Sequence, residues 1–205
     1  MSKRIPLIDF NRSYTFSNYF DLPYETEDIV GEFGYSFKRA HLNLPLSDRT
    51  LERHASLKER IEESLPYISR QSEIARREFL IAPLLMDVVH YTHVKLVSEY
   101  SLVVTEQLKG SFDYYLYEQN QVLIVEAKKA DLDRGFTQLA VELIALEQWT
   151  DSDNQILTGA VSTGSIWQFG QLNRNSKVIT QDLNLYTVPA NLEELQRILV
   201  KILSC

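Results

Sequence analysis

The spacing of apolar residues predicts two helices after the first 47 residues of the chain. Apolar side chains recur at helical spacing behind Ser47 and Asp48, either of which can cap the helix, and the stripe consists of Leu51, Leu57, Ile61 and Leu65. Pro66 interrupts this pattern. Residues 77–91 are apolar nearly all round, so we expect a buried helix there, with a kink or a start at Pro83.

Three strands and a helix follow in the pattern. Residues 94–104, 112–118 and 122–128 are dense in β-branched and aromatic side chains, which is typical of strands. Residues 131–149 return to the helical period, and residues 156–163 predict a further buried strand. This order of helix, three strands, helix and strand predicts an α/β (α+β) domain around a mixed central sheet flanked by helices.

Both ends of the chain add to this core. Residues 1–47 are rich in Tyr, Phe, Pro and Asn and indicate strands and loops, among them residues 35–44, in an extended N-terminal appendage. The main domain is then residues 48–205, with its core at about residues 75–163. Residues 166–172 and 178–188 predict a hairpin. Residues 191–203 predict a last helix that is capped by Asn191 and has two acids in its first turn.

Composition and charge restrict the class of protein. With 44% hydrophobic and 24% charged residues, the 205-residue chain is expected to form a packed fold. Without a long apolar run or a secretory signal, and with Cys205 as its single cysteine, the sequence predicts a cytoplasmic protein lacking disulfides and thiolate zinc sites. The net charge of −7 argues against a protein whose main property is binding nucleic acid, although it allows an enzyme with a local basic strip.

The stretch from Gly110 to Lys129 carries the candidate chemistry. If its two strands form a hairpin with a tight turn between Gln119 and Asn120, Tyr117 pairs with Val122, Tyr115 pairs with Ile124, and Asp113 lies opposite Glu126. Side chains alternate along a strand, so Asp113, Glu126 and Lys128 would project from one face. A three-residue loop would scatter them over both faces, so this prediction depends on the turn.

Two opposed carboxylates repel each other unless a cation lies between them. Lys128 offsets part of that charge, and a divalent ion such as Mg²⁺ or Mn²⁺, which prefers oxygen ligands, does so better. A metal held by two acids lowers the pKa of a bound water and binds a phosphate oxygen, with a lysine beside that water. The pattern therefore favours hydrolysis of a phosphodiester.

These motifs resemble the PD-(D/E)XK nuclease superfamily. The likeness rests on Gly110-x-x-Asp113, on Glu126-Ala127-Lys128 after twelve intervening residues, and on Gln138 in the next helix. The nearest likeness is to the N-terminal nuclease domains of type I restriction motor subunits, in which an acid like Glu78 precedes an apolar stretch that contains a proline. The resemblance covers about residues 75–163 and implies a restriction-endonuclease-like core with elements in the order αβββαβ.

The resemblance also implies the roles of individual residues. Asp113, Glu126 and the backbone carbonyl of Ala127 would bind the metal, and Glu78 would contribute to its outer shell. Lys128 would position the attacking water, and Gln138 would orient water or substrate. Lys129 and Arg134 are candidates for gripping phosphate. Since many relatives act as dimers, a homodimer is expected by analogy.

The sequence departs from the family pattern at two positions. Phe112 stands where the family name has a proline, and Glu142 stands where some exonuclease branches have a tyrosine four residues after the glutamine. No P-loop or helicase motif is present, so the chain is no motor by itself.

Other interpretations of these residues stay open. Asp113 fits a strand-end acid, Glu126 a partner of Lys128 or Lys129, Gln138 a solvent-facing residue and Glu78 a surface acid, while the pair His90 and His93 is a weak zinc motif. The sequence favours a magnesium-dependent DNA endonuclease, a hydrolase. The alternative is a catalytically silent nuclease-fold protein that binds nucleic acid or a protein partner.

Overall fold

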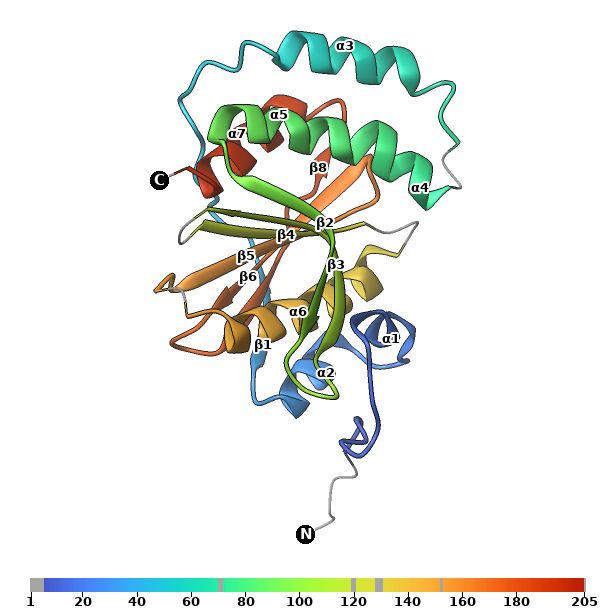
Figure 1. Ribbon diagram of the computed structural model, residues 1–205, viewed down its shortest axis with the longest axis vertical. Helices are drawn as coiled ribbons and strands as arrows, with labels where there is room; N and C mark the ends of the chain where they lie inside the picture. The colour runs from blue at the N-terminus through green and yellow to red at the C-terminus, as the bar shows by residue number, and fades with distance from the viewer. Residues whose placement is uncertain (1–5, 70–71, 119–120, 128–130, 152, 205) are drawn as a thin grey trace.

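A mixed eight-stranded sheet lies between two layers of helices (Figure 1). This is the arrangement in a computed structural model that describes residues 6–69, 72–118, 121–127, 131–151 and 153–204. The helices are α1 Phe16–Asp21, α2 Thr26–Glu32, α3 His54–Ser64, α4 Glu73–Arg76, the π-helix η1 Arg77–Ile81, α5 Ala82–Thr92, α6 Leu132–Trp149 and α7 Leu192–Ile202. The strands are β1 Ser36–Ala40, β2 Lys95–Val103, β3 Lys109–Glu118, β4 Gln121–Ala127, β5 Ile156–Ser162, β6 Ile166–Asn173, β7 Val178–Asp182 and β8 Tyr186–Thr187. The predicted mixed α/β class with a helix-flanked sheet is confirmed.

The strands run in the spatial order β1-β7-β6-β5-β4-β3-β2, and β8 pairs with β6. β4 and β5 are parallel, as are β1 and β7, while the remaining pairs are antiparallel. Helix α6 connects the parallel strands β4 and β5, which is the usual crossover for such a pair. Because β4 and β5 are parallel, their carboxyl ends lie side by side at the same end of the strands.

One layer contains α3, η1, α5 and α7, whose apolar side chains share a core with one face of the sheet. Helix α7 directs Leu195, Ile198 and Leu199 into this core, as its periodicity predicts. Asn191 occupies the predicted cap position, but its side chain accepts hydrogen bonds from the amide and hydroxyl of Thr187 instead. Helix α3 begins at His54, later than the predicted start near residue 49.

Pro83 shapes the helix that runs from α4 to α5. Proline has no amide hydrogen and cannot donate to the residue four positions earlier, so an uninterrupted α-helix would leave a carbonyl unsatisfied there. The chain instead widens into the π-helix η1 directly before α5, and the Ala82 amide donates to the carbonyl of Arg77. The predicted irregularity at Pro83 is thus a short π-helix, which ends at Ile81, two residues before the proline.

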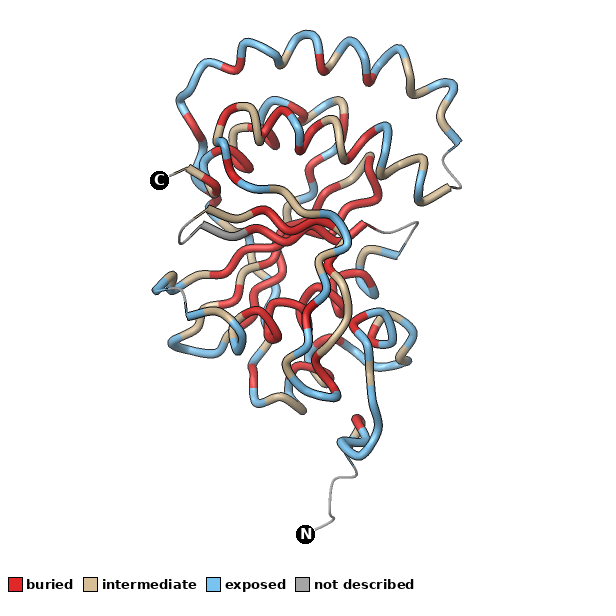
Figure 2. Tube along the Cα trace, viewed as in Figure 1, coloured by how far each residue is buried: buried red, intermediate tan, exposed pale blue. Residues whose placement is uncertain are grey.

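The other layer is built on α6, which packs against the sheet together with α1 and α2. The central strands and α6 are the most completely buried parts of the chain (Figure 2). Gly159 and Gly170 lie beneath the helix, where an added Cβ would come within 2.7 Å of Leu139 and of Phe136 respectively. The absence of side chains at these two positions lets α6 lie directly on β5 and β6.

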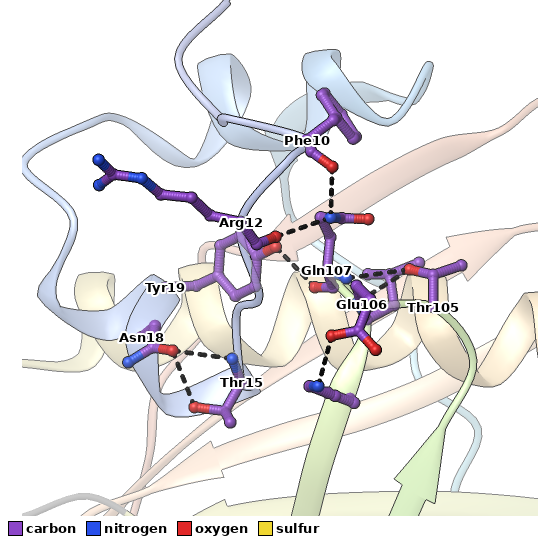
Figure 3. A network of polar contacts seen from close by, with 10 residues as sticks. Phe10, Arg12, Thr15, Asn18, Tyr19, Thr105, Glu106 and Gln107 are labelled. Carbon is purple, nitrogen blue, oxygen red and sulfur yellow. Dashed lines mark hydrogen bonds and ion pairs between the residues drawn. The ribbon is translucent and has the colours of Figure 1, made fainter.

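Residues 6–40 are part of this layer and of the sheet, while Leu44 packs in the core of the opposite layer. The prediction of strands and loops is confirmed for β1, which pairs with β7, and wrong for α1 and α2. These two helices are too short to show a long apolar period in the sequence. They are stabilised by packing on α6 and β3. The segment is also tied to the β2–β3 turn (Figure 3): Gln107 donates to the carbonyls of Phe10 and Arg12, both at 2.8 Å, and accepts from the Tyr19 hydroxyl at 2.7 Å.

No helix in the described ranges has the length and apolar character to cross a membrane.

Candidate functional site

The β3–β4 hairpin has the predicted register. Tyr117 pairs with Val122 and Tyr115 with Ile124, and the pairs run from Tyr114–Val125 to Glu118–Gln121. The predicted turn itself, residues 119 and 120, lies outside the described part of the chain. The ladder ends at Tyr114–Val125, one step before the predicted pair of Asp113 and Glu126.

Asp113 is held at this position by two contacts. Its Oδ2 accepts a hydrogen bond from the Ala127 amide at 2.8 Å, which ties it to the segment that carries Glu126. Its Oδ1 lies 3.2 Å from the guanidinium of Arg77 in the π-helix. The side chain of Asp113 is 15% exposed, so it is reachable from solvent at the edge of the sheet.

Glu126 faces α6 and is 2% exposed. Its Oε1 accepts a hydrogen bond from Gln138 Nε2 at 2.7 Å, and the same nitrogen donates to Glu142 Oε1 at 2.8 Å. Gln138 and Glu142 are also buried, so the solvent-facing interpretation of Gln138 is wrong. Two carboxylates from different elements therefore converge on one buried amide.

The described partners of the two opposed acids come from different layers of the fold. Glu126 contacts α6, whereas Asp113 contacts Arg77 of η1, which belongs to the layer of α3, α5 and α7. These contacts do not support the expectation that both carboxylates enclose one cation on one face, because Asp113 pairs with Arg77 on one side of the sheet and Glu126 with Gln138 on the other.

Arg77 supplies the positive charge beside Asp113. It also contacts Glu99 at 2.6 Å, and its guanidinium lies 5.3 Å from the centre of the Tyr114 ring. Burial by itself would lower the pKa of Arg77, but attraction to Asp113 and the hydrogen bond with Glu99 outweigh it and raise that pKa. Burial raises the pKa of Tyr114. Arg77 thus stays charged.

Several predicted residues lie elsewhere. Glu78 is exposed and lines a groove of about 670 Å³ between α3 and α5, facing Arg53 and Arg60, so the structure does not bring it to Asp113. Arg134 is exposed beside Asp131 at the start of α6. Lys128 and Lys129, predicted to position water and to grip phosphate, lie outside the described residues.

His90 and His93, the candidate zinc pair, have different surroundings in the structure. His90 Nε2 lies 2.7 Å from Glu52, and His93 ends α5 in a left-handed conformation. In the described ranges no three or more His, Cys, Asp or Glu side chains form a group that could hold a metal ion.

The oxygen atoms around the hairpin nevertheless suit a hard cation. Asp113, Glu126 and the Ala127 carbonyl supply the kind of ligands that Mg²⁺ and Mn²⁺ take. Gln138 Oε1 is a buried acceptor without a hydrogen-bond partner in the described part of the chain, which is the environment in which an ion or an ordered water is needed. The residues present thus fit a divalent metal, provided that Arg77 leaves Asp113.

Sequence reasoning missed Arg77 and the role of Glu142. Glu142 had a usable signal, since it is an acid one turn after Gln138 in a helix that is otherwise apolar at its centre. For Arg77 the sequence offered no signal other than its position next to Glu78. Comparison of the chain with protein families, with characterised proteins and with solved structures finds no match.

Proposed function

We propose that the chain is a metal-dependent phosphodiesterase of the PD-(D/E)XK kind and acts on DNA as an endonuclease. The observation that carries this proposal is that Asp113, next to the last pair of the β3–β4 ladder, accepts a hydrogen bond from the Ala127 amide at 2.8 Å and so lies beside the segment that carries Glu126. Two carboxylates close together on neighbouring strands repel each other, and a metal site is a physical reason to keep them.

The arrangement of elements supports the same proposal. Helix α5 is followed by β2, β3 and β4, then by α6 and β5, which matches the αβββαβ order of a restriction-endonuclease-like core. Glu126 and Ala127 end β4 beside Val161 and Ser162 of the parallel strand β5. Ligands of α/β sheets commonly bind where parallel strands end, so this edge is where we expect the substrate.

Asp113, Glu126 and the Ala127 carbonyl would hold Mg²⁺ or Mn²⁺, which supplies a water of lowered pKa and neutralises charge on a phosphate. Gln138 is a positioning residue, because its amide fixes the Glu126 carboxylate from behind. Lys128 is assigned the orientation of the attacking water from its place in the Glu126-Ala127-Lys128 motif.

A substrate panel tests the proposal. Supercoiled plasmid, linear duplex, single strands and a four-way junction are incubated with Mg²⁺ or Mn²⁺ and with wild type, Glu126→Gln, Lys128→Ala or Glu118→Gln. Wild type and Glu118→Gln, an acid at the turn end of β3, are expected to cleave, while Glu126→Gln loses at least about a hundredfold of the rate. Equal cleavage by all four proteins would mean a contaminating nuclease and would contradict the assignment.

A second candidate is a silent nuclease-fold module that binds nucleic acid without cutting it. The Arg77–Asp113 ion pair favours it, because a carboxylate neutralised by arginine does not need a metal. Under this alternative no substrate is cleaved, Mn²⁺ leaves the melting temperature of wild type and Asp113→Asn unchanged, and labelled DNA still binds. Under the nuclease proposal Mn²⁺ raises the melting temperature of wild type but not of Asp113→Asn.

A further inference from the structure

Arg77 is the described residue that competes with a metal at the proposed centre. Its Nη1 lies 3.2 Å from Asp113 Oδ1, and its Nη2 lies 2.6 Å from Glu99 Oε1, so one guanidinium bridges two acids. The other oxygen of Asp113 accepts from the Ala127 amide. Both oxygens of Asp113 are thus engaged, and a metal can take Oδ1 only if Arg77 leaves it.

The backbone of Arg77 is anchored independently of this ion pair. Its carbonyl accepts hydrogen bonds from the Ala82 amide and, at 3.3 Å, from the Tyr114 hydroxyl. The guanidinium also stays close to the Tyr114 ring, at 5.3 Å. Release of Asp113 is therefore a side-chain rotation of Arg77 and needs no movement of η1.

Glu99 provides the second hold on the guanidinium. It lies on β2 across from Asp113, where no ladder pair forms between Ser98–Tyr114 and Tyr100–Phe112, and its backbone has a φ of 53°. This left-handed conformation is unfavourable for a residue with a side chain, and it belongs to the position that contacts Arg77. The Glu99 side chain is 59% exposed against 20% for Arg77, so the bridge extends from the buried site outward to solvent.

We propose that Arg77 is an exchangeable cation of the active site, an inference that rests on the proposed nuclease function. Without metal it neutralises Asp113. When a divalent ion binds Asp113, repulsion between the two cations turns the guanidinium away, and Arg77, still paired with Glu99, contacts a phosphate of the nucleic acid. A guanidinium suits both states because its planar fork binds carboxylate and phosphate equally well.

Calorimetric titration with Mn²⁺ tests the first half of the exchange. Arg77→Met keeps an apolar stem but removes the competitor, so its affinity for Mn²⁺ is expected to rise by about tenfold relative to wild type. Glu99→Gln leaves Arg77 with Asp113 as its described carboxylate partner, so Mn²⁺ should bind more weakly than in wild type. Arg12→Met is the matched control, because Arg12 forms a similar pair with Asp9 at 3.3 Å on the surface, and it should behave as wild type.

The outcomes of this titration separate the two proposals. Equal affinity in wild type, Arg77→Met and Glu99→Gln would overturn the exchange and leave the metal centre intact. Absence of Mn²⁺ binding in every variant would overturn both the metal centre and the exchange. The opposite shifts of Arg77→Met and Glu99→Gln keep the test decisive even if one of them is too unstable to purify.

Fluorescence anisotropy of labelled duplex tests the second half. Binding is measured over a series of salt concentrations, with Ca²⁺ or with EDTA, for wild type and Arg77→Met. If Arg77 contacts a phosphate only after a metal has displaced it, the variant makes the negative slope of log K against log salt shallower by about 0.9 with Ca²⁺ and leaves it unchanged with EDTA. An equal change in both conditions would contradict the exchange.

Discussion

At Gln138 a single amide nitrogen serves two buried carboxylates, Glu126 on β4 and Glu142 one helical turn away on α6. A buried charge is costly unless it is paired or hydrogen-bonded, so this amide is worth more than one at the surface. It also orients Glu126, which connects the stability of the helix–sheet contact to the geometry of the proposed centre.

Gln138→Leu, a change of similar volume, is expected to lower the free energy of unfolding in urea by about 3 kcal/mol, because two hydrogen bonds are lost and two buried acids lose a donor. Gln171→Leu is the comparison, since its amide makes a 3.5 Å contact with the Thr158 hydroxyl, and it should cost less than about 1 kcal/mol. Similar losses for both variants would mean that the amide of Gln138 has no special role.

Among the helices and strands, α6 is the one whose position matters most for the proposed site, because its distance from the sheet decides whether Gln138 reaches Glu126. That distance depends on Gly159 and Gly170, over which the buried side chains of Leu139 and Phe136 pack. A helix raised from β5 and β6 would withdraw the amide from β4.

Gly170→Ala is therefore expected to destabilise the fold by about 2 kcal/mol, because the new methyl group overlaps the Phe136 ring in a filled core. Gly31→Ala is the matched substitution: a Cβ there has nothing within 4 Å, and alanine favours the helix by up to about 1 kcal/mol. Urea unfolding of both variants gives the comparison. Equal effects would show that α6 can rise without cost.

On the scale of the whole molecule, the N-terminal residues and the later strands share one core. Phe16 is 1% exposed and stacks on Phe112 of β3, with ring centres 5.5 Å apart. Tyr35 donates to Glu147 of α6 at 2.7 Å, directly before β1 enters the sheet. The early segment therefore supports both β3 and α6, the two elements that carry Asp113 and Gln138.

Phe16→Ala is expected to lower the stability of the entire chain by about 3 kcal/mol and to shift one common thermal transition in near- and far-ultraviolet circular dichroism. Phe10→Ala, at a ring that is 48% exposed, should change stability by less than about 1 kcal/mol. A separate early transition in Phe16→Ala, with the main one unmoved, would instead show that the N-terminal segment folds as an independent appendage.

Most of the elements from α5 to α7 were predictable, because each has a long apolar period or a dense run of strand-forming residues. The exception is the predicted strand 178–188, which is divided into β7 and β8, both paired with β6. The β3–β4 register was predictable for a similar reason, since a tight turn and side-chain alternation determine which residues face each other. Helices α1 and α2 were missed because segments this short have little period of their own and depend on packing against α6.

By itself the sequence determined the class of fold and the β3–β4 hairpin, because both follow from the spacing of apolar residues and from contacts between near neighbours in the chain. Only the tertiary structure decided that Arg77 neutralises Asp113, that Gln138 and Glu142 close behind Glu126, and that Glu78 points elsewhere. These contacts join residues of separate elements. Their geometry depends on how η1 and α6 pack against the sheet, which no local pattern encodes.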